Sequence, residues 1–527
     1  MFDKLRFLKK PKYTAFFAAV LFGFLIHLFG LVTIVHNYDD IAVNPVGFGS
    51  SVQSGRWGLG VLGGVFHLLF GSYNIPFLYG LIFLFFIGLS VAMIVTMFDI
   101  KSHKLAIIIG ALFVVFPTAT STMFFKYTAH YYAVAIFLAV WAAKKLAESK
   151  RGFILGTLFI VLSLSIYQAY LPLTIGLLVL FLLKRILEDD SSTFVRTIQT
   201  GLFFCLSIIT AFILYRLSVE LSIVVGNKVL VIVRQAMPSI VIDDFVLSSY
   251  QGINSMGNIT VSSLFESVIK SFKLFFTLPI EDYCGLASTV VLKILYPVFW
   301  LLTVIICGVV LVIKKRKLSH IFGVLLLLVL FPLAVNFIVV MCPNSLIYTL
   351  MVYSFVLVPC APILLIESWN SADSLPRIRV AFKRVLASVS IFMIAIYSVS
   401  TTVNYTYMYY QTRQAENYVA SLVTQIRMTE DFSTDKPWAF IGSIEDPLLN
   451  SGWASVPTYG GSGDIKTILN SYSRNEWIKT YIGYTPTFAS NGKVSEIKAT
   501  EEFKSMPIWP NEGSIRVINE CVVVRFE

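Results

Sequence analysis

Residues 13–35 read YTAFFAAVLFGFLIHLFGLVTIV, and residues 36–40 continue directly as HNYDD. The first stretch has 23 residues and no charged side chain, and about 20 apolar residues are enough to cross the hydrocarbon core of a bilayer. A cleavable signal peptide has a shorter apolar core, of about 7–15 residues. We therefore interpret residues 13–35 as an uncleaved signal anchor, which crosses a membrane and leaves an acid pair at its far end.

The composition of the whole chain also indicates an integral membrane protein. Of its 527 residues, 57% are hydrophobic and only 13% are charged, whereas soluble globular chains carry about 25% charged residues. The net charge of +11 does not indicate nucleic-acid binding, because the basic residues form short clusters between apolar segments. More than half of the 41 Lys and Arg residues lie in such clusters, which the positive-inside rule assigns to the cytoplasm.

About eleven membrane-spanning helices are predicted, with the N-terminus in the cytoplasm and the C-terminus outside. The predicted spans are 13–35, 75–98, 105–123, 127–143, two within 152–183, 197–215, 294–313, 318–341, 345–366 and 385–403. Residues 57–72 are uncharged but short and rich in glycine. We expect them to form an interfacial or re-entrant helix at the outer face, which protein or a water-filled cavity must cover.

Residues 152–183 contain no charged side chain and allow two interpretations. They could form one long tilted helix, or two shorter helices hinged near Tyr167-Gln168 and Pro172, because proline disfavours an uninterrupted helix. Basic residues flank both ends of the stretch. Since basic loops stay in the cytoplasm, two crossings are favoured.

Two further segments are predicted to lie outside the membrane, one within the membrane glycosyltransferase domain of residues 1–410 and one after it. Residues 216–293 mix polar, charged and apolar side chains and are expected to form a large outer loop with amphipathic helices. Residues 411–527 regain charge, Pro, Gly and Trp, and they include strand-like pieces at 438–441 and 514–526. The predicted fold is an all-α polytopic membrane protein with a small extracytoplasmic α/β domain at its C-terminus.

The pair Asp39-Asp40 in the first outer loop is the first candidate for chemistry. A carboxylate at this position could act as general base towards a hydroxyl group, while its neighbour holds the loop or a substrate hydroxyl. His36 abuts the pair and is a weaker, substrate-binding candidate. The alternative is that the pair is only the solvated end of a helix.

Arg56, in the sequence Ser54-Gly55-Arg56-Trp57, is the candidate phosphate ligand. A guanidinium group is always charged, and its fork of N–H groups matches phosphate oxygens. A fixed cation helps most where a leaving phosphate gains charge. The alternative is an interfacial arginine that contacts lipid headgroups.

Two groups of polar and aromatic residues further along the chain are candidates for the same outer cavity. The helix that begins at Lys126 places Tyr127, His130 and Tyr131 on one face by their i, i+3 and i+4 spacing, although an aromatic belt at the membrane interface is the alternative. The pair Tyr167-Gln168 interrupts an apolar run, where a polar amide needs a partner. That partner could be substrate or backbone.

Other familiar sites are missing from the sequence. No phosphate-binding loop, dinucleotide fingerprint or Asp-x-Asp pattern occurs, and no two of the six cysteines form a CxxC motif. We therefore expect no nucleotide at the site, no cofactor and no metal.

The chain resembles the phage-type, serotype-converting glucosyltransferases that decorate bacterial O-antigen. These enzymes belong to the integral membrane glycosyltransferases of the GT-C-like class. The resemblance is carried by Tyr38-Asp39-Asp40 after the first span, by Gly55-Arg56-Trp57, by Ser165-Ile166-Tyr167-Gln168 and by the order of the spans. It covers most of the first 400 residues, and the C-terminal domain contributes little to it.

The resemblance implies a function at the outer face of the bacterial inner (cytoplasmic) membrane. It implies a polyprenyl-phosphate sugar as donor, most often glucose, and a polysaccharide such as O-antigen of lipopolysaccharide as acceptor. It also implies two companions, a synthase that makes the polyprenyl-phosphate glucose and a flippase that delivers it. By resemblance, Asp39 or Asp40 acts as base in a one-step inverting displacement, with Arg56 near the donor phosphate. Lys126, at the start of the next inward span, is a further candidate for binding that phosphate.

Two alternative functions fit a membrane protein of this kind. A polysaccharide polymerase or ligase would use similar chemistry with another donor, and Arg216 and Arg234 in the predicted outer loop leave this open. A non-enzymatic lipid or polysaccharide transporter tends to show internal repeats and charged or broken helices at mid-membrane. Here the charges lie in loops and no repeat is visible, which disfavours a transporter.

Overall fold

The computed structural model of the chain describes residues 10–43, 52–71, 75–236, 244–247, 260–370, 376–444 and 458–526. It is mostly helical, with a small sheet near the C-terminus, as the sequence predicts. The chain divides into two compact units. Unit 1 comprises the described parts of Met1–Leu28 and Phe48–Thr401, and unit 2 comprises the described parts of Phe29–Gly47 and Thr402–Glu527.

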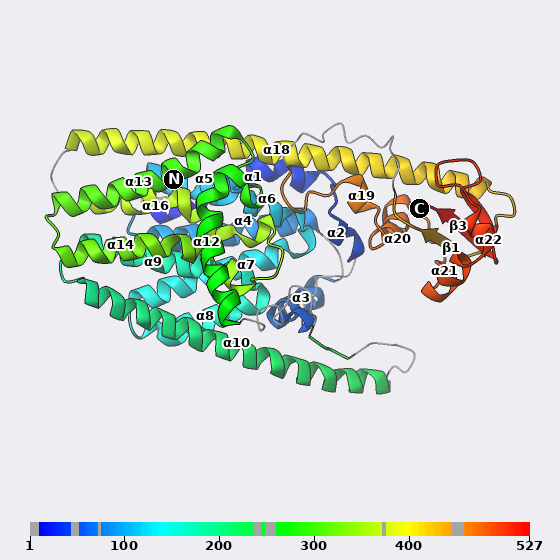
Figure 1. Ribbon diagram of the computed structural model, residues 1–527, viewed down its shortest axis with the longest axis horizontal. Helices are drawn as coiled ribbons and strands as arrows, with labels where there is room; N and C mark the ends of the chain where they lie inside the picture. The colour runs from blue at the N-terminus through cyan, green and yellow to red at the C-terminus, as the bar shows by residue number, and fades with distance from the viewer. Residues whose placement is uncertain are drawn as a thin grey trace, which may run out of the picture. The chain divides into compact units, whose positions relative to one another are not determined.

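Unit 1 is a bundle of helices, in which α9, α13, α14 and α16 pack side by side (Figure 1). Its helices are α1 (Pro11–Val32), whose last residues belong to unit 2, α3 (Trp57–Phe70), α4 (Pro76–Met97), α5 (His103–Val115), α6 (Pro117–Phe124), α7 (Lys126–Glu148), α8 (Gly152–Ile166), α9 (Leu171–Glu188), α10 (Phe194–Ala236), α12 (Val261–Glu281), α13 (Val290–Ile313), α14 (Leu318–Val335), α15 (Ile338–Met341), α16 (Leu357–Leu365), α17 (Glu367–Asn370) and the first half of α18 (Pro376–Met428). Short 3-10 turns, η2 (Val52–Ser54), η3 (Gln168–Tyr170), η4 (Tyr283–Gly285), η5 (Thr349–Met351) and η6 (Tyr353–Val356), connect them.

Fewer than eleven helices in the described part of the chain have the length and composition of a membrane span. Among the described residues, seven helical segments are long and apolar enough, or eight if the bent pair α5–α6 is one span. The predicted number of eleven is therefore not confirmed. Helix α8 has 15 residues and the segment Tyr353–Trp369 is also short, against about 20 needed for a crossing, while α7 begins and ends with polar residues.

Breaks in the helices fall where the sequence carries proline or polar residues. Helices α5 and α6 meet at an angle of 42° where Pro117 begins α6. Between α8 and α9 the backbone of Tyr167 is extended, with φ −155° and ψ 115°, and Pro172 lies in the first turn of α9. The prediction that residues 152–183 form two helices hinged at Tyr167-Gln168 is therefore confirmed.

Two helices continue well beyond the predicted spans. Helix α10 has 43 residues and continues past Tyr215 to Ala236, and α18 has 53 residues and continues past position 403 to Met428. At 1.5 Å per residue they are about 65 Å and 80 Å long, compared with a hydrocarbon core of about 30 Å. The composition of each helix changes from apolar to mixed near these positions, but no proline or glycine ends the helix there.

Several loops that are rich in basic residues meet at one end of unit 1. Arg316, after α13, pairs with Asp190 and donates to the carbonyl of Leu187, 2.7 Å away, at the end of α9. Lys184 of α9 donates to the carbonyl of Phe98, after α4. Ser368 of α17 donates to Glu188 at 3.0 Å. The loops after α4, α9, α13 and α16 thus lie together.

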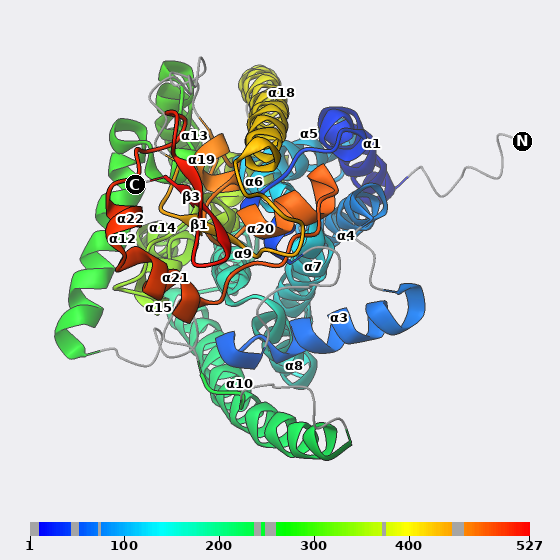
Figure 2. The ribbon, with the colours of Figure 1, turned by 90° about the vertical axis from the view of Figure 1, so that its right-hand side faces the viewer.

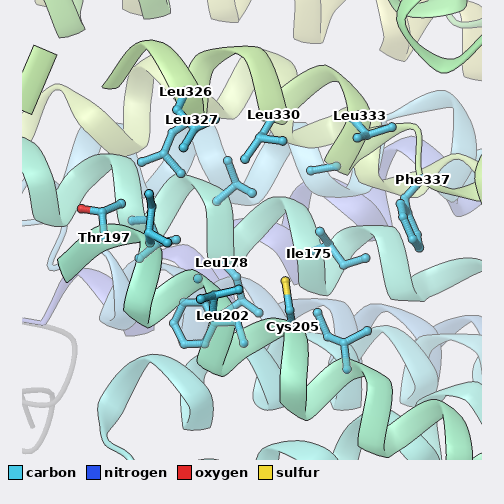
Figure 3. Close-up of a pocket in the computed structure, with 17 residues that line it drawn as sticks. Ile175, Leu178, Thr197, Leu202, Cys205, Leu326, Leu327, Leu330, Leu333 and Phe337 are labelled. Atoms are coloured by element: carbon cyan, nitrogen blue, oxygen red, sulfur yellow. The ribbon is translucent and has the colours of Figure 1, made fainter. Parts of the chain in front are cut away.

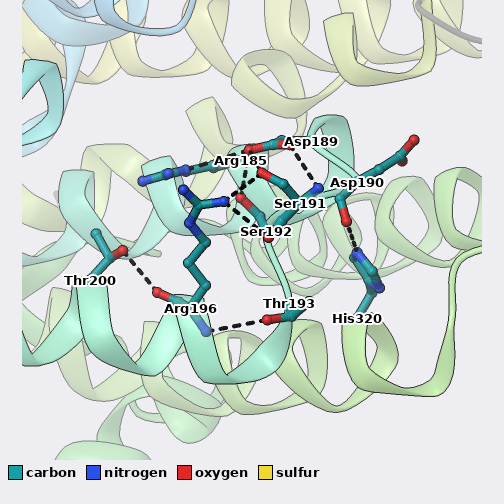
Figure 4. Close-up of polar contacts among 9 residues, drawn as sticks. All are labelled: Arg185, Asp189, Asp190, Ser191, Ser192, Thr193, Arg196, Thr200 and His320. Carbon is teal, nitrogen blue, oxygen red and sulfur yellow. Dashed lines mark hydrogen bonds and ion pairs between the residues drawn. The ribbon is translucent and has the colours of Figure 1, made fainter.

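The turn between α9 and α10 at this end is closed by side chains (Figure 4). The carboxylate of Asp189 accepts from the backbone N–H of Ser191 at 2.8 Å and from the hydroxyl of Ser192 at 3.0 Å. Arg196 donates to the hydroxyl of Ser191 at 2.8 Å. These bonds fix the direction in which α10 leaves α9.

Unit 2 contains a three-stranded sheet in the order β1-β3-β2 (Figure 2). Strand β1 (Trp438–Ile441) pairs in parallel with β3 (Cys521–Arg525), which pairs antiparallel with β2 (Ile515–Ile518). The predicted strand at 438–441 is confirmed. The predicted strand-like piece at 514–526 is a hairpin whose two-residue turn, Asn519 and Glu520, has φ 46° and 59°, as a type I′ turn requires.

The other elements of unit 2 are short helices and the second half of α18. They are α2 (Tyr38–Ala42), α19 (Ile465–Ile468), α20 (Arg474–Trp477), the π-helical turn η7 (Ile478–Ile482), α21 (Asn491–Lys498) and α22 (Glu501–Lys504). One hydrophobic core joins Val419 and Leu422 of α18, Val522 of β3 and Trp477 of α20. Ile41 of α2, from the first loop of the chain, is fully buried in this same core. The first loop therefore folds as part of unit 2.

Candidate functional site

Arg56 lies in unit 1 between η2 and α3, directly after Gly55, whose φ of 74° favours glycine. Its Nε donates to Oε1 of Gln168 at 3.3 Å, and one terminal nitrogen donates to the hydroxyl of Tyr132 at 3.4 Å. The guanidinium carbon lies 4.7 Å from the ring centroid of Tyr167. The sequence predicted only that Arg56, Tyr167 and Gln168 are candidates for the same outer cavity. The structure brings these three residues into contact.

A second set of hydrogen bonds fixes the loop that carries Arg56. Nε2 of Gln168 donates to the carbonyl of Ser54 at 2.9 Å and to the hydroxyl of Tyr215 at 2.8 Å. The hydroxyl of Tyr215 donates to the carbonyl of Gly55 at 3.0 Å. The amide of Gln168 therefore finds both backbone and side-chain partners, and it holds the 54–56 turn against α9 and α10.

Helix α3 continues from this turn and packs on α8 (Figure 2). The indole N–H of Trp57 donates to the hydroxyl of Ser218 at 2.9 Å, which ties the start of α3 to α10. A Cβ atom at Gly58 would collide with the hydroxyl of Ser165. The absence of a side chain at Gly58 thus allows the two helices to approach closely, and both motifs noted in the sequence meet here.

The partners of Arg56 that these contacts identify are all uncharged. Tyr132 and Tyr167 stack with their ring centroids 4.3 Å apart, so the tyrosines form a preformed wall beside the guanidinium. Arg56 itself is only partly buried. A partly buried guanidinium with neutral partners keeps its full positive charge for an anion, and its planar fork suits phosphate.

The Arg56 cluster and the basic loops lie at opposite ends of one helical segment. Gln168 begins and Glu188 ends a 21-residue apolar segment, which is about 30 Å long at 1.5 Å per residue. This is also the approximate thickness of the hydrocarbon core. The Arg56 cluster is therefore about one membrane thickness away from the end where Lys184 and Arg316 gather.

The remaining residues predicted at the start of α7 form a separate aromatic cluster in unit 1. The ring of His130 stacks on Tyr79 of α4 with centroids 4.1 Å apart, and it lies 3.7 Å from the ring of Tyr131 and 5.1 Å from that of Phe66. Lys126 is buried in the first turn of α7 and Tyr127 is partly buried next to it. The contact of α7 with Arg56 comes instead from Tyr132.

Asp39, Asp40 and His36 lie in unit 2, whereas Arg56 lies in unit 1. Asn37 caps helix α2, because its side chain accepts from the N–H of Asp39 at 2.8 Å, and it also donates to the carbonyl of Gly461. Part of the predicted catalytic loop 36–57, residues 44–51, lies outside the described residues.

In the predicted outer loop 216–293, the described Asp244 pairs with Arg234 at 2.9 Å.

The two neighbouring acids differ in their surroundings. Asp40 is buried, with 2% of its surface exposed, whereas Asp39 is only partly buried. Burial raises the pKa of Asp39 from its ordinary value of 3.8 to about 6. Of the two, Asp39 is thus the more exposed carboxylate, and its pKa lies in the range suited to a general base.

Several residues of these clusters were not predicted from the sequence. Tyr132 and Tyr215 contact the Arg56 turn, and Gly461, Trp477 and Tyr481 contact the loop before Asp39. A weak signal for Tyr215 exists, since it ends the predicted span 197–215. The three C-terminal residues are more than 400 positions from the loop, and no local pattern links them to it.

An apolar cavity of about 300 Å³ lies in unit 1 between α9, α10 and α14 (Figure 3). Its lining includes Leu178 and Leu182 of α9, Leu202 and Cys205 of α10, and Leu330 of α14. Because these side chains are apolar, the cavity is suited to a hydrocarbon chain.

Among the described residues, no group of three or more His, Cys, Asp or Glu side chains could hold a metal ion.

Comparison with known proteins identifies the family of the chain. No curated protein and no solved structure is matched. A family model described as "Glucosyl transferase GtrII" matches residues 28–359, which is more than half of the chain and includes Asp39, Asp40, Arg56 and the Tyr167-Gln168 break. With its long apolar helices, the chain is a membrane protein that belongs to the GtrII glucosyl transferase family.

Proposed function

We propose that this protein transfers glucose from a polyprenyl phosphate to a cell-surface polysaccharide such as O-antigen, at the outer face of the bacterial inner membrane and with inversion at the anomeric carbon. The observation that carries the proposal is Arg56, a cation held by the neutral side chains of Gln168, Tyr132 and Tyr167 within the region that matches the family. Family membership favours this function over a transporter.

Arg56 binds the donor phosphate in this proposal, and Lys126 supplies a second positive charge. As the bond between the anomeric carbon and the phosphate oxygen breaks, the phosphate leaves with the electron pair and gains negative charge. A cation already held in place stabilises that charge without reorganisation. The hydrogen bonds of Gln168 and Tyr215 to the 54–56 turn are what keep Arg56 in place.

Asp39 acts as the base. It takes the proton of an acceptor hydroxyl while that oxygen attacks the anomeric carbon from the face opposite the leaving phosphate, and this inverts the configuration. Asp40 is buried at the centre of α2, and its role is to keep that helix in position. We place His36, Tyr127, His130, Tyr131, Tyr167 and Gln168 around the substrates.

The apolar cavity supports a lipid-linked donor. Gln168, in the turn η3 that leads into α9, and Tyr215 of α10 lie at the Arg56 end. Ile175 of α9 and Ile208 of α10, each seven residues away along the chain, line the cavity. Seven residues of helix are about 10 Å. A polyprenyl chain whose phosphate is bound by Arg56 can thus enter the cavity between the same two helices.

The orientation follows from the distribution of basic loops. The loops that meet around Lys184 and Arg316 are rich in Lys and Arg, which favours the cytoplasm, so we infer that the Arg56 cluster faces outside. Alkaline phosphatase, which is active only outside the cytoplasm, is expected to be active when fused after Val43 and inactive when fused after Ser191. Activity in the opposite pattern would contradict the proposed site.

The pH dependence of kcat/KM should report the base. Since the pKa of Asp39 is raised to about 6, its carboxylate takes up a proton as the pH falls through 6, and transfer should fall about tenfold for each pH unit below that value. Rates of glucose transfer between pH 4.5 and 8 measure this. A profile that stays flat down to pH 4.5 would exclude Asp39 as the base.

The direct test uses the purified full chain in lipid vesicles with polyprenyl-phosphate glucose and O-antigen polysaccharide. Transfer of glucose to the polysaccharide, with release of polyprenyl phosphate, is expected. In cells, the surface glycan should lose glucose when this chain, the donor synthase or the flippase is removed. Movement of lipid-linked sugar across the vesicle membrane without glucose transfer would instead identify a transporter.

A further inference from the structure

The loop that carries Asp39 is held by the C-terminal part of the chain, within unit 2. The backbone N–H of His36 donates to the hydroxyl of Thr412 of α18 at 3.4 Å, and the side chain of Asn37 donates to the carbonyl of Gly461. The ring of His36 lies 4.0 Å from the ring of Tyr481 and 5.0 Å, edge to face, from that of Trp477. Two consecutive residues before α2 are therefore each held by the C-terminal segment.

The partners of this loop are themselves fixed by α18. The amide oxygen of Asn404 accepts from the N–H of Tyr459 at 2.8 Å, and that of Gln411 accepts from the N–H of Ile465 at 2.9 Å. Between them Gly463 has φ 61°, and a Cβ atom there would lie 3.5 Å from the carbonyl of His36. The segment 459–465 thus has a defined conformation directly against the acid loop.

None of these C-terminal partners lies in the region that matches the family, which ends at residue 359. The acids and their support consequently come from separate parts of the sequence. Ile41, the residue after the acid pair, is fully buried among Trp477, Ile468 and Leu422. Helix α2 has only five residues, too few to be stable alone, so its position depends on this packing.

Resting on the function proposed above, we propose that Tyr481 and Gly461 position the catalytic base. Tyr481 packs against His36 and Gly461 receives the hydrogen bond of Asn37, and together they act as a clamp on α2. Tyr481 and Gly461 are positioning residues, because they act through His36 and Asn37 of the loop and touch no reacting atom. A misplacement of about 1 Å in a catalytic group can lower a rate about 10²-fold.

The charges around Asp39 allow a clean test of this clamp. The titratable groups on α2 and on the elements packed against it include Asp40 and Tyr38 on α2 itself, His36 before it, Asp464 and Lys466 at α19, Tyr472 before α20, Arg474 and Glu476 on α20, Lys479 and Tyr481 on η7, and Arg413 and Glu416 on α18. Neither Asn37→Ala nor Tyr481→Leu removes a carboxylate, a histidine, a lysine or an arginine. A change in the titration of the base in these variants therefore reports its position and burial.

The experiment compares wild type, Tyr481→Leu, Asn37→Ala and Tyr481→Phe in the vesicle assay. Tyr481→Leu and Asn37→Ala are expected to lower kcat about tenfold or more with little change in the KM for donor, and to move the acidic limb of the pH profile from about 6 towards the value of about 4 of an exposed aspartate. Tyr481→Phe keeps the ring and should restore both. Tyr484→Ala, a control at an exposed tyrosine that packs on Arg427, should match wild type.

The results separate this inference from the proposed function. If wild-type protein shows no transfer, the proposed function fails. If wild type transfers glucose and Tyr481→Leu and Asn37→Ala keep its kcat and its acidic limb, the clamp is excluded while the function stands. If Tyr481→Leu is poorly folded by thermal unfolding, Asn37→Ala decides by the same two readouts. A lower kcat with an unmoved acidic limb would reduce the clamp to general structural support and overturn the proposal.

Discussion

Asp39→Asn is expected to lower kcat for glucose transfer by about 10²–10⁴-fold, the range of general base catalysis. The amide has nearly the shape of the carboxylate, so α2 and its cap by Asn37 should remain. It cannot accept the proton of the acceptor hydroxyl, however, and the attacking oxygen loses its activation. Rates are measured with purified protein under saturating polyprenyl-phosphate glucose, and binding of the donor is measured separately.

Asp40→Asn is the matched control for this prediction. Asp40 is buried and cannot be reached by the acceptor, so its substitution should affect thermal stability more than kcat. In Asp39→Asn the residual activity should also lose its acidic limb near pH 6. If Asp39→Asn retains wild-type turnover and Asp40→Asn does not, the base is Asp40, and if both retain it, no acid of this loop is the base.

The helices and their breaks were largely predictable because their causes are local. Pro172 and the polar pair Tyr167-Gln168 interrupt an apolar run, and the structure separates α8 from α9 at that point. The β-branched run Val522–Val524 likewise indicated β3, and the strand-like piece at 438–441 corresponds to β1. The number of spans was less predictable, since hydropathy does not show that α8 has only 15 residues.

Contacts between distant parts of the chain were not predictable from local patterns. Spacing indicated that Tyr127, His130 and Tyr131 share a face of α7. The residue of α7 that contacts Arg56 is instead Tyr132, because the packing of α7 against other helices, and not spacing along the chain, decides which side chain reaches Arg56. The parallel pairing of β1 with β3 joins residues about 80 positions apart. For the same reason the sequence could not indicate that the acid loop folds with the C-terminal unit.

Arg56→Gln is the second substitution with a large expected effect, a fall in kcat of about 10²–10³-fold, typical of losing one group that stabilises developing charge. Glutamine can still bond to Gln168 and Tyr132, so the 54–56 turn should persist. Because the charge acts mostly on the departing phosphate, kcat should fall more than the KM for donor rises. Arg56→Lys keeps the charge but loses the planar fork and its stacking on Tyr167, and it should recover only part of the rate.

Arg216→Gln separates a specific role of Arg56 from a general effect of positive charge. Arg216 follows Tyr215 on α10, but it is exposed and pairs with Glu220 at 2.6 Å, and exposed pairs contribute little. Arg216→Gln should therefore leave kcat within about twofold of wild type, by the same reasoning. Equal losses in Arg56→Gln and Arg216→Gln would mean that attraction of the anionic lipid to the outer surface, and not a phosphate ligand, sets the rate. A loss confined to Arg56, partly restored by lysine, requires a cation at the reacting phosphate.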